Sequence, residues 1–347
     1  FQNQRPTLRF KLHPSGELLV KRILVIGGGS IGERHVRCFL RTGQAAVSLC
    51  ETRDEIRQRL ASDYQLDEVF DAFDTAIAQN FDGAVICTPA HLHVLMATQL
   101  VERGTGVLIE KPLSTKPHGI DRLVELVDAG KIPVSIAYVM RQHPALQAMK
   151  QALESGRFGR PVQIVDSGGQ HFPFYRPAYR ETYYTRHETG GGAIQDALTH
   201  VMNSAEWLVG PVTKLAADAE HCLLEGVEVE DTVHVITRHG AVLGSFSLNQ
   251  HQPANESTLT VLCERGAIRF ESHSASWSSC VEPDSVWQLE EKFSLERDDL
   301  FVRQAQAFLN QMDGKSEPAC SLDEGLQTLR VNLATLESVE TESWRHL

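Results

Sequence analysis

The sequence has no apolar run long enough to cross a bilayer as a helix, which argues against a helical membrane protein. It also has no excess of basic residues, because 33 lysines and arginines stand against 45 acidic residues and give a net charge of −12. Non-specific binding to nucleic acid depends on neutralising phosphates, which this balance opposes. We therefore expect neither a membrane nor a nucleic acid among the partners of this chain.

Cysteine pairs at metal-binding or redox spacing are also lacking. The seven cysteines are odd in number, scattered, and free of any CxxC motif, which predicts reduced thiols rather than a disulfide framework or a zinc site. The N-terminal stretch is polar and basic and has no apolar core, so we do not expect it to act as a secretory signal. Together these features predict a cytoplasmic protein.

What is present is an ordinary globular composition, with 42% apolar and 22% charged residues in 347 residues, enough for two domains. In the first part, short β-branched runs alternate with helix-like stretches. Near-continuous apolar strands that alternate with helices predict a parallel sheet covered on both faces, which is a doubly wound Rossmann arrangement. The predicted strands cover residues 22–27, 46–51, 83–88, 106–111 and 133–138.

The pattern changes after residue 140. A helix is predicted over 143–156, followed by a long loop and then a second helix that carries Asp196 and His200. Period-two runs around His239-Gly240 and Arg265-Gly266 predict two hairpins, and the tail from about 298 to 340 is predicted to be helical. The fold class is therefore α/β: an N-terminal Rossmann doubly wound parallel sheet plus a C-terminal α+β domain with an open, largely antiparallel sheet. The expected divisions are an N-terminal extension (1–20), a Rossmann domain (21–140) and a second, α+β domain (141–347).

A glycine-rich turn follows the first predicted strand. Gly27, Gly29 and Gly32 fit G-x-G-x-x-G between a strand and a helix, where close backbone approach to a pyrophosphate is required. Ser30 and Ile31 lie inside this turn, and we expect them to contact the cofactor too. The alternative is a glycine turn without a ligand.

Glu51 ends the second predicted strand, where an adenosine ribose presents its hydroxyls. A carboxylate at this position repels a 2′-phosphate, which favours NAD. Arg53 can instead pair with such a phosphate, so NADP stays open as the cofactor. A solvated glutamate is the alternative reading of this position.

The fourth and fifth predicted strands end in "CTPAHLH" and "IEKPLS". The carboxyl ends of strands line the ligand crevice of a doubly wound sheet, so Lys111 is placed to donate to the oxygen of a reacting alcohol or ketone. A surface lysine in a turn is the alternative. Further cofactor contacts are expected from these strand ends, at Thr88, Pro89, His93, Glu110 and Lys111.

The stretch "ETGGGAIQDALTH" sets Asp196 and His200 four residues apart on a predicted helix, after three glycines. Histidine suits removal of a hydroxyl proton, and the aspartate can orient it. Glycines 190–192 allow a sharp turn beside a bulky ligand. Incidental polar residues on a helix are the alternative. A metal site is a third reading, but no further ligand cluster is evident, and we expect no metal.

The segment 171–188 contains four of the six tyrosines and three arginines. Aromatic faces stack on sugars and arginines grip carboxylates or phosphates, so the segment is a candidate substrate lid, although a structural loop held by aromatic packing is an equal alternative. The residues predicted to bind substrate are Arg141, Tyr175, Tyr179 and Arg180.

Taken together, the motifs "GGGSIG", "ICTPAHLH", "LIEKPL" and "GGGAIQDALTHVMNSAEWLVG" resemble, in order and approximate spacing, those of the glucose–fructose oxidoreductase/inositol dehydrogenase family (Gfo/Idh/MocA). The resemblance implies a catalytic trio at Lys111, Asp196 and His200 and a homodimer or homotetramer formed through the C-terminal sheet. Two departures concern substrate choice: Asn203 stands where the family often has aspartate, and "ALTH" replaces a frequent Gly-Ser before the histidine.

The expected function is therefore NAD(P)-dependent hydride transfer at a secondary hydroxyl or ketone of a sugar, cyclitol or sugar derivative. Two alternatives stay open. One is a glycosidase- or lyase-type relative that oxidises its substrate only transiently, and the other is a dinucleotide-binding regulator without catalysis.

Overall fold

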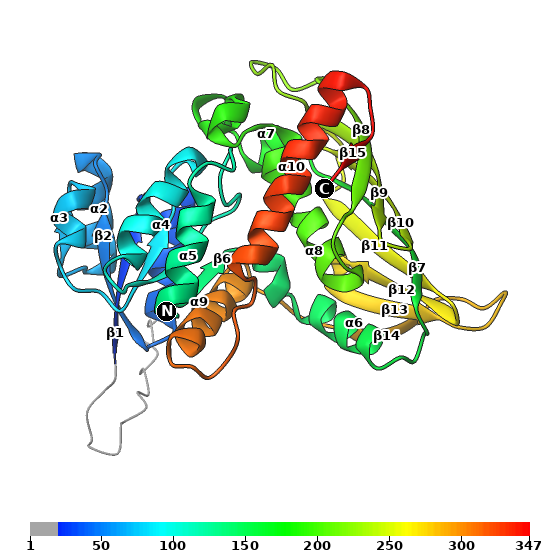
Figure 1. Ribbon diagram of the computed structural model, residues 1–347, viewed down its shortest axis with the longest axis horizontal. Coiled ribbons are helices and arrows are strands. Elements are labelled where there is room, and N and C mark those ends of the chain that lie inside the picture. The colour runs from blue at the N-terminus through cyan, green and yellow to red at the C-terminus, as the bar shows by residue number, and fades with distance from the viewer. Residues whose placement is uncertain (1–19) are drawn as a thin grey trace, which may run out of the picture.

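The computed structural model describes residues 20–347 and contains two sheets, one for each predicted domain (Figure 1). The sheet near the N-terminus has six strands and the other has nine. Both the doubly wound parallel sheet and the largely antiparallel second sheet are thus confirmed. The extension predicted for residues 1–20 lies, apart from Val20, outside the described residues.

All strand pairs of the first sheet are parallel, in the order β3-β2-β1-β4-β5-β6. The order reverses between β1 and β4, and this point of reversal is where doubly wound sheets bind dinucleotides. The strands are β1 (Lys21–Ile26), β2 (Ala45–Cys50), β3 (Val69–Phe70), β4 (Gly83–Ile86), β5 (Gly106–Ile109) and β6 (Val134–Ile136).

Side chains of β1 alternate between the two faces of this sheet, and all of them are buried from Ile23 onward. Leu24 and Ile26 belong to the core under α4 and α5, whereas Ile23 and Val25 belong to the core under α1 and α9. Burial on both faces explains the continuous apolar runs in the sequence. The helices of this part are α1 (Ser30–Arg41), α2 (Asp54–Tyr64), α3 (Phe73–Ile77), α4 (His93–Val101) and α5 (Ile120–Gly130).

The second sheet has the order β14-β13-β12-β11-β7-β10-β9-β8-β15. Its pairs are antiparallel except for β7 and β10, which run parallel. The strands are β7 (Pro161–Gly169), β8 (Lys214–Glu220), β9 (Thr232–His239), β10 (Val242–Asn249), β11 (Glu256–Cys263), β12 (Gly266–Glu271), β13 (Ser276–Cys280), β14 (Gln288–Lys292) and β15 (Arg345–His346).

The predicted long loop after residue 156 is wrong, because it contains β7, the strand at the middle of the sheet. Its sequence "PVQIVDSGG" lacks a clear alternation, since Asp166 occupies a buried position and two glycines end the strand. Both predicted hairpins are present, but β10 begins at Val242 and β12 at Gly266, so each turn differs by one residue from its predicted position.

Helices α6 (Pro144–Glu154), α7 (Phe172–Tyr175) and α8 (Thr199–Val209) follow the Rossmann part, and α9 (Asp299–Met312) and α10 (Leu322–Thr341) form the predicted helical tail. The tail does not pack only on the second sheet. Phe308 and Leu309 of α9 pack in the core on the face of the first sheet that carries Ile23 and Val25. Leu329 of α10 packs in the core on the opposite face of that sheet. The chain thus returns to the first sheet after leaving it (Figure 1).

Candidate active site

The turn from β1 to α1 has the shape that a pyrophosphate requires. A Cβ added at Gly32 would collide with the backbone carbonyl of Gly27, so helix and strand pack too closely for any side chain. A Cβ at Gly29 would meet nothing within 4 Å, which leaves an open cradle at the first turn of α1. No side chain caps this helix, so its N-terminal N–H groups can receive an anion.

Glu51 lies at the end of β2 and is buried, as its predicted role requires. Its carboxylate accepts the backbone N–H of Gly28 at 2.7 Å and that of Arg53 at 2.8 Å, and it also accepts the guanidinium of Arg53 twice, at 3.0 Å. Burial raises the pKa of Glu51, but the bonds from Arg53 and Gly28 outweigh it and hold the pKa at about 2.

The Arg53 side chain covers this carboxylate from the solvent side and is itself 61% exposed. A ribose that binds Glu51 through its hydroxyls has to displace the guanidinium. The displaced Arg53 is then available to a 2′-phosphate.

At the end of β4, His93 is buried and fixed by two backbone carbonyls. Its Nδ1 lies 3.0 Å from the oxygen of Pro112 and its Nε2 lies 2.8 Å from the oxygen of Thr88. Burial lowers the pKa of this imidazole. Each ring nitrogen thus faces a carbonyl oxygen, and the neutral ring donates its single N–H to one of the two. His93 thereby ties the start of α4 to the strand ends, and its predicted cofactor contact stays a prediction.

Glu110 is buried beyond β5, where it accepts His35 Nε2 at 2.8 Å. It also accepts the backbone N–H of Lys111 at 3.1 Å. Burial alone raises the pKa of this carboxyl, but the bond from His35 and the charges of His35 and Lys111 outweigh burial, so the net pKa is lowered. This hydrogen bond links α1 to the strand end that carries Lys111.

Lys111 reaches from the Rossmann part to the segment before α8. Its Nζ donates to the backbone oxygen of Asp196 at 2.6 Å and to Asp196 Oδ1 at 3.2 Å. Both side chains are largely enclosed, with exposed fractions of 15% and 7%. Burial raises the pKa of Asp196, but the charges of Lys111 and Arg176 outweigh this effect, so the carboxylate stays ionised.

His200 lies in the first turn of α8, with its ring edge-on to Tyr138 at 6.0 Å. Burial and then the charge of Lys111 lower its pKa to about 3, so the imidazole is neutral at neutral pH. Among residues 20–347 its Nδ1 has no hydrogen-bond partner. The Asp196 carboxylate binds Lys111 and makes no hydrogen bond to this ring. Asp196 acts on His200 through its negative charge, which favours the protonated imidazole.

Residues Ile194–Leu198 form one π-helical turn before α8 begins at Thr199, so Asp196 and His200 are not related by an ordinary α-helical turn. The wider turn separates the two side chains, which explains why the predicted contact between them is absent. Such π-turns occur often at functional sites.

The glycines before this turn lie so close to other protein atoms that a side chain would not fit. A Cβ at Gly191 would collide with the carbonyl of Tyr184, and one at Gly192 would collide with the carboxylate of Glu230. Glu230 also accepts the backbone N–H of Ile194 at 2.9 Å. The tight packing holds the segment before the site against the start of the helical region.

Two residues of the 171–188 segment belong to the site but were not in the predicted set. The Tyr183 hydroxyl donates to Asp196 Oδ1 at 2.7 Å. After burial and the charge of Lys111, the charge of Arg176 also affects both groups and lowers the pKa values of Asp196 and His200. The aromatic composition pointed to the segment, but nothing in the sequence distinguishes these positions from their neighbours.

The predicted substrate contacts Tyr179 and Arg180 are engaged elsewhere. Tyr179 is buried and donates to the backbone oxygen of Glu225 at 2.6 Å, and Arg180 Nε donates to the same oxygen at 2.8 Å. These contacts fix the loop at Glu225, and the predicted substrate contacts of both side chains stay predictions. Tyr175 is exposed and packs edge-on against Phe174.

Arg141 is likewise enclosed by the protein. Its guanidinium binds Asn203 Oδ1 at 2.9 Å and Glu324 Oε1 at 2.7 Å, and lies over the ring of Trp207. With 3% of the residue exposed, it joins α8 to α10 rather than reaching the crevice. Asn203, one of the departures noted above, is its partner.

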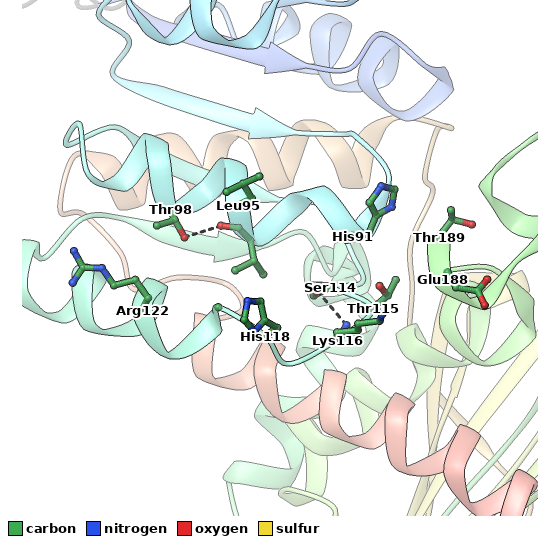
Figure 2. Close-up of a pocket in the computed structure, with 12 residues that line it drawn as sticks. His91, Leu95, Thr98, Ser114, Thr115, Lys116, His118, Arg122, Glu188 and Thr189 are labelled. Atoms are coloured by element: carbon green, nitrogen blue, oxygen red, sulfur yellow. Dashed lines mark hydrogen bonds between the residues drawn. The ribbon is translucent and has the colours of Figure 1, made fainter.

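A groove of about 650 Å³ lies beside the site, between the outer sides of α4 and α5 and the 188–189 backbone. Figure 2 shows Glu188 and Thr189 facing His91 across it, with Lys116 and His118 below. The catalytic trio does not line this groove. In the described part of the chain, no three His, Cys, Asp or Glu side chains gather as a metal site, and no helix is both long and apolar enough to span a membrane.

Comparison with known proteins gives two family models, one that covers the first sheet and one that covers the second sheet from β7 into β12. An oxidoreductase family with an NAD-binding Rossmann fold (GFO_IDH_MocA) matches residues 21–138, and the GFO/IDH/MocA C-terminal domain matches residues 146–269. The cradle at Gly29 and the carboxylate at Glu51 fit the NAD that this domain binds.

Individual relatives are more distant. Inositol 2-dehydrogenase 1 of Saccharopolyspora erythraea is 33% identical over 48% of this chain and 52% of its own length, so the chain spans about half the length of the curated relatives it matches. D-xylose 1-dehydrogenase [NADP(+)] of Haloarcula marismortui is 23% identical over 78% and 76% of the two chains.

Solved structures share the fold over nearly the full length. A levoglucosan dehydrogenase in complex with NADH and levoglucosan has a TM-score of 0.85 at 20% identity and covers 94% of this chain and 99% of its own. The WlbA dehydrogenase of Bordetella pertussis, in complex with NADH and UDP-GlcNAcA, has a TM-score of 0.80 at 25% identity and covers 94% and 98%. The two family models match residues 21–138 and 146–269, which together make up most of the chain. The chain therefore belongs to the Gfo/Idh/MocA oxidoreductase family.

Proposed function

We propose that the protein transfers hydride between a nicotinamide cofactor and a secondary hydroxyl or ketone of a sugar, cyclitol or sugar derivative. The observation that carries the proposal is the contact between Lys111, which follows β5, and Asp196. Asp196 lies in the π-helical turn that precedes α8, the helix that contains His200. Lys111 thus lies at the carboxyl edge of the Rossmann sheet, where doubly wound sheets bind dinucleotides, and after burial its charge is the largest cause of the lowered pKa of His200.

Each side chain has a role that follows from its environment. Lys111 donates to the reacting oxygen and stabilises negative charge that develops on it. His200, neutral because its pKa is about 3, accepts the hydroxyl proton during oxidation and returns it during reduction. Asp196 holds the ammonium of Lys111 in place. When bound, NAD supplies the hydride acceptor.

The test is transfer of deuterium from labelled NADH to the carbonyl carbon in a panel of ketosugars, oxidised cyclitols and the keto forms of uronic acids and nucleotide sugars. We expect transfer to at least one compound in the wild-type protein and none in Lys111→Ala or His200→Ala. Bond cleavage in an unoxidised sugar with NAD bound and no release of NADH would support the transient-oxidation alternative. Tight NAD binding with no transfer to any compound would overturn the proposal in favour of a regulator.

NAD is the proposed main cofactor, because Glu51 is ionised at the position that a 2′-phosphate would approach. Use of NADP is proposed to depend on rotation of Arg53. Comparing the dissociation constants of NADH and NADPH by fluorescence titration tests both statements.

A homodimer or homotetramer through the second sheet is also proposed. The sheet exposes apolar side chains on β9, β10 and β11, namely Ile236, Leu243 and Leu262. Light scattering on the protein and on Leu243→Glu tests this surface; an unchanged mass in the variant would contradict it. A cytoplasmic location is proposed from the seven free cysteines, and cell fractionation tests it.

A further inference from the structure

The 171–188 segment brings one phenol into direct contact with the acid of the site. Tyr183 donates to Asp196 Oδ1 at 2.7 Å, and Lys111 Nζ donates to the same oxygen at 3.2 Å. Lys111 also donates to the Asp196 backbone oxygen at 2.6 Å. One carboxylate oxygen is therefore shared by a phenol and an ammonium that come from different parts of the chain.

The position of this phenol is set by the protein and not by chance contact at the surface. Thr189 Oγ1 donates to the Tyr183 carbonyl at 2.6 Å. The next residue, Tyr184, is buried against Phe172 with ring centroids 4.6 Å apart, and its hydroxyl bonds Gln250. Tyr183 is thus held from both sides; 41% of the residue as a whole is exposed, while its hydroxyl lies in the partly buried contact with Asp196.

The segment is tied down a second time after Tyr183. His187 Nε2 lies 2.5 Å from Glu230 Oε2, and the other oxygen of Glu230 accepts the backbone N–H of Ile194. Gln195 Nε2 donates to the His187 carbonyl at 2.9 Å. The same acid therefore fixes the end of the segment and the start of the helical region that carries Asp196, which keeps the phenol and the carboxylate in register.

We propose that Tyr183 is a positioning residue, whose hydroxyl fixes the Asp196 carboxylate and through it the ammonium of Lys111 at the place where the reacting oxygen binds. The inference rests on the proposed function. Without the phenol, Oδ1 keeps only Lys111, and the carboxylate is free to rotate toward it. The lysine is then drawn away from the substrate oxygen. Its stabilisation of the negative charge on that oxygen is lost mainly in the transition state and less in the bound substrate.

Protonation states agree with this arrangement. Burial and the charge of Asp196 raise the pKa of Tyr183 well above its usual value, so the phenol remains a donor. The groups that face Asp196 are Lys111 from the end of β5, Arg176 and Tyr183 from the segment, and His200 from α8. Burial raises the pKa of Asp196, whereas Lys111, Arg176 and the Tyr183 hydroxyl lower it. Loss of the hydroxyl therefore moves this pKa upward.

The test compares Tyr183→Phe with Tyr184→Phe, a matched loss of the neighbouring buried phenol that does not touch Asp196. We expect Tyr183→Phe to lower kcat roughly tenfold, as for one hydrogen bond to a charged group, with the KM for NADH unchanged. The acid limb of its pH–rate profile moves to higher pH. Tyr184→Phe lowers thermal stability and leaves both kcat and the profile unchanged.

A second readout needs neither substrate nor turnover. The carboxyl carbon of Asp196 is titrated by NMR in the ¹³C-aspartate-labelled protein, with Asp196→Asn to assign the signal. The inference is supported if the Asp196 carboxyl titrates at higher pH in Tyr183→Phe but not in Tyr184→Phe. It is overturned if the wild type, Tyr183→Phe and Tyr184→Phe have the same Asp196 titration and the same kcat. A titration shift in a protein that reduces no compound confirms the hold of Tyr183 on Asp196 and overturns the redox function instead.

Discussion

Two acids near the carboxyl ends of the Rossmann strands are each paired with a cation, one pair after β2 and the other after β5. The two pairs differ in how they can move. Glu51 and Arg53 are two residues apart, and the arginine side chain is mostly exposed. Asp196 and Lys111 come from different parts of the chain and are both enclosed. A rotamer change opens the first pair, whereas the second opens only if the two parts separate. The first pair is therefore suited to selecting a ligand and the second to holding reacting atoms.

The largest effect should come from the enclosed pair. We expect Lys111→Ala to lower kcat/KM by about 10³-fold or more, because a preorganised donor to the developing oxyanion is lost. The variant also leaves Asp196 buried without its cation, so its Tm should fall. Steady-state kinetics and thermal unfolding measure both. Lys116→Ala, on the loop that follows, is the control; equal losses in the two variants would contradict the comparison.

Asp166 shows what happens to a buried acid that has no cation. Within residues 20–347 the only hydrogen bond to its carboxyl group comes from Ser257 Oγ at 3.2 Å, and burial raises the pKa of this group to about 7. The folded protein therefore keeps this proton up to about pH 7, whereas the unfolded chain releases it near pH 4. Stability due to this group is present at low pH and is lost as pH rises through that window.

Replacing this acid removes the pH dependence. We expect Asp166→Asn to match the wild type near pH 4 and to exceed it by on the order of a few kcal/mol at pH 8. Denaturant unfolding at a series of pH values measures the difference, in which other titrating groups cancel. A difference that is constant from pH 4 to pH 8 would show that Asp166 does not titrate in this range.

At the open pair the effect should be smaller and selective. Arg53→Ala should weaken NADPH binding about tenfold, because a charge-assisted partner for the 2′-phosphate is lost. NADH binding should hold or improve, since the ribose no longer has to displace a guanidinium. Arg59→Ala on the same helix, where the side chain pairs with Glu33, is the control. Equal weakening of both cofactors would remove the selective role of this pair.

The smallest effect concerns Arg180, which packs over Gly226 and binds Glu225. Its replacement by alanine should change KM for substrate by less than about twofold. A large rise in KM would restore the prediction that this arginine binds substrate.

The Rossmann part and its strand-end residues were predictable because their signals are local. Continuous apolar strands and the glycine turn are visible in a few residues, and Lys111 follows from its position at a strand end. The role of β7 was not predictable, since its central place depends on pairing with β10 and β11, which lie far along the chain. The choice of Tyr183 rather than Tyr179 was hidden for the same reason, because Glu225 and Asp196 decide it through distant contacts.

The return of α9 to the first sheet has a consequence for any attempt to study the cofactor-binding part in isolation. Phe308 and Leu309 complete the core around Ile23 and Val25. A fragment that stops at residue 140 would leave this apolar face open to water, and such surfaces promote aggregation. A minimal nucleotide-binding fragment would have to carry residues 299–312 grafted behind β6.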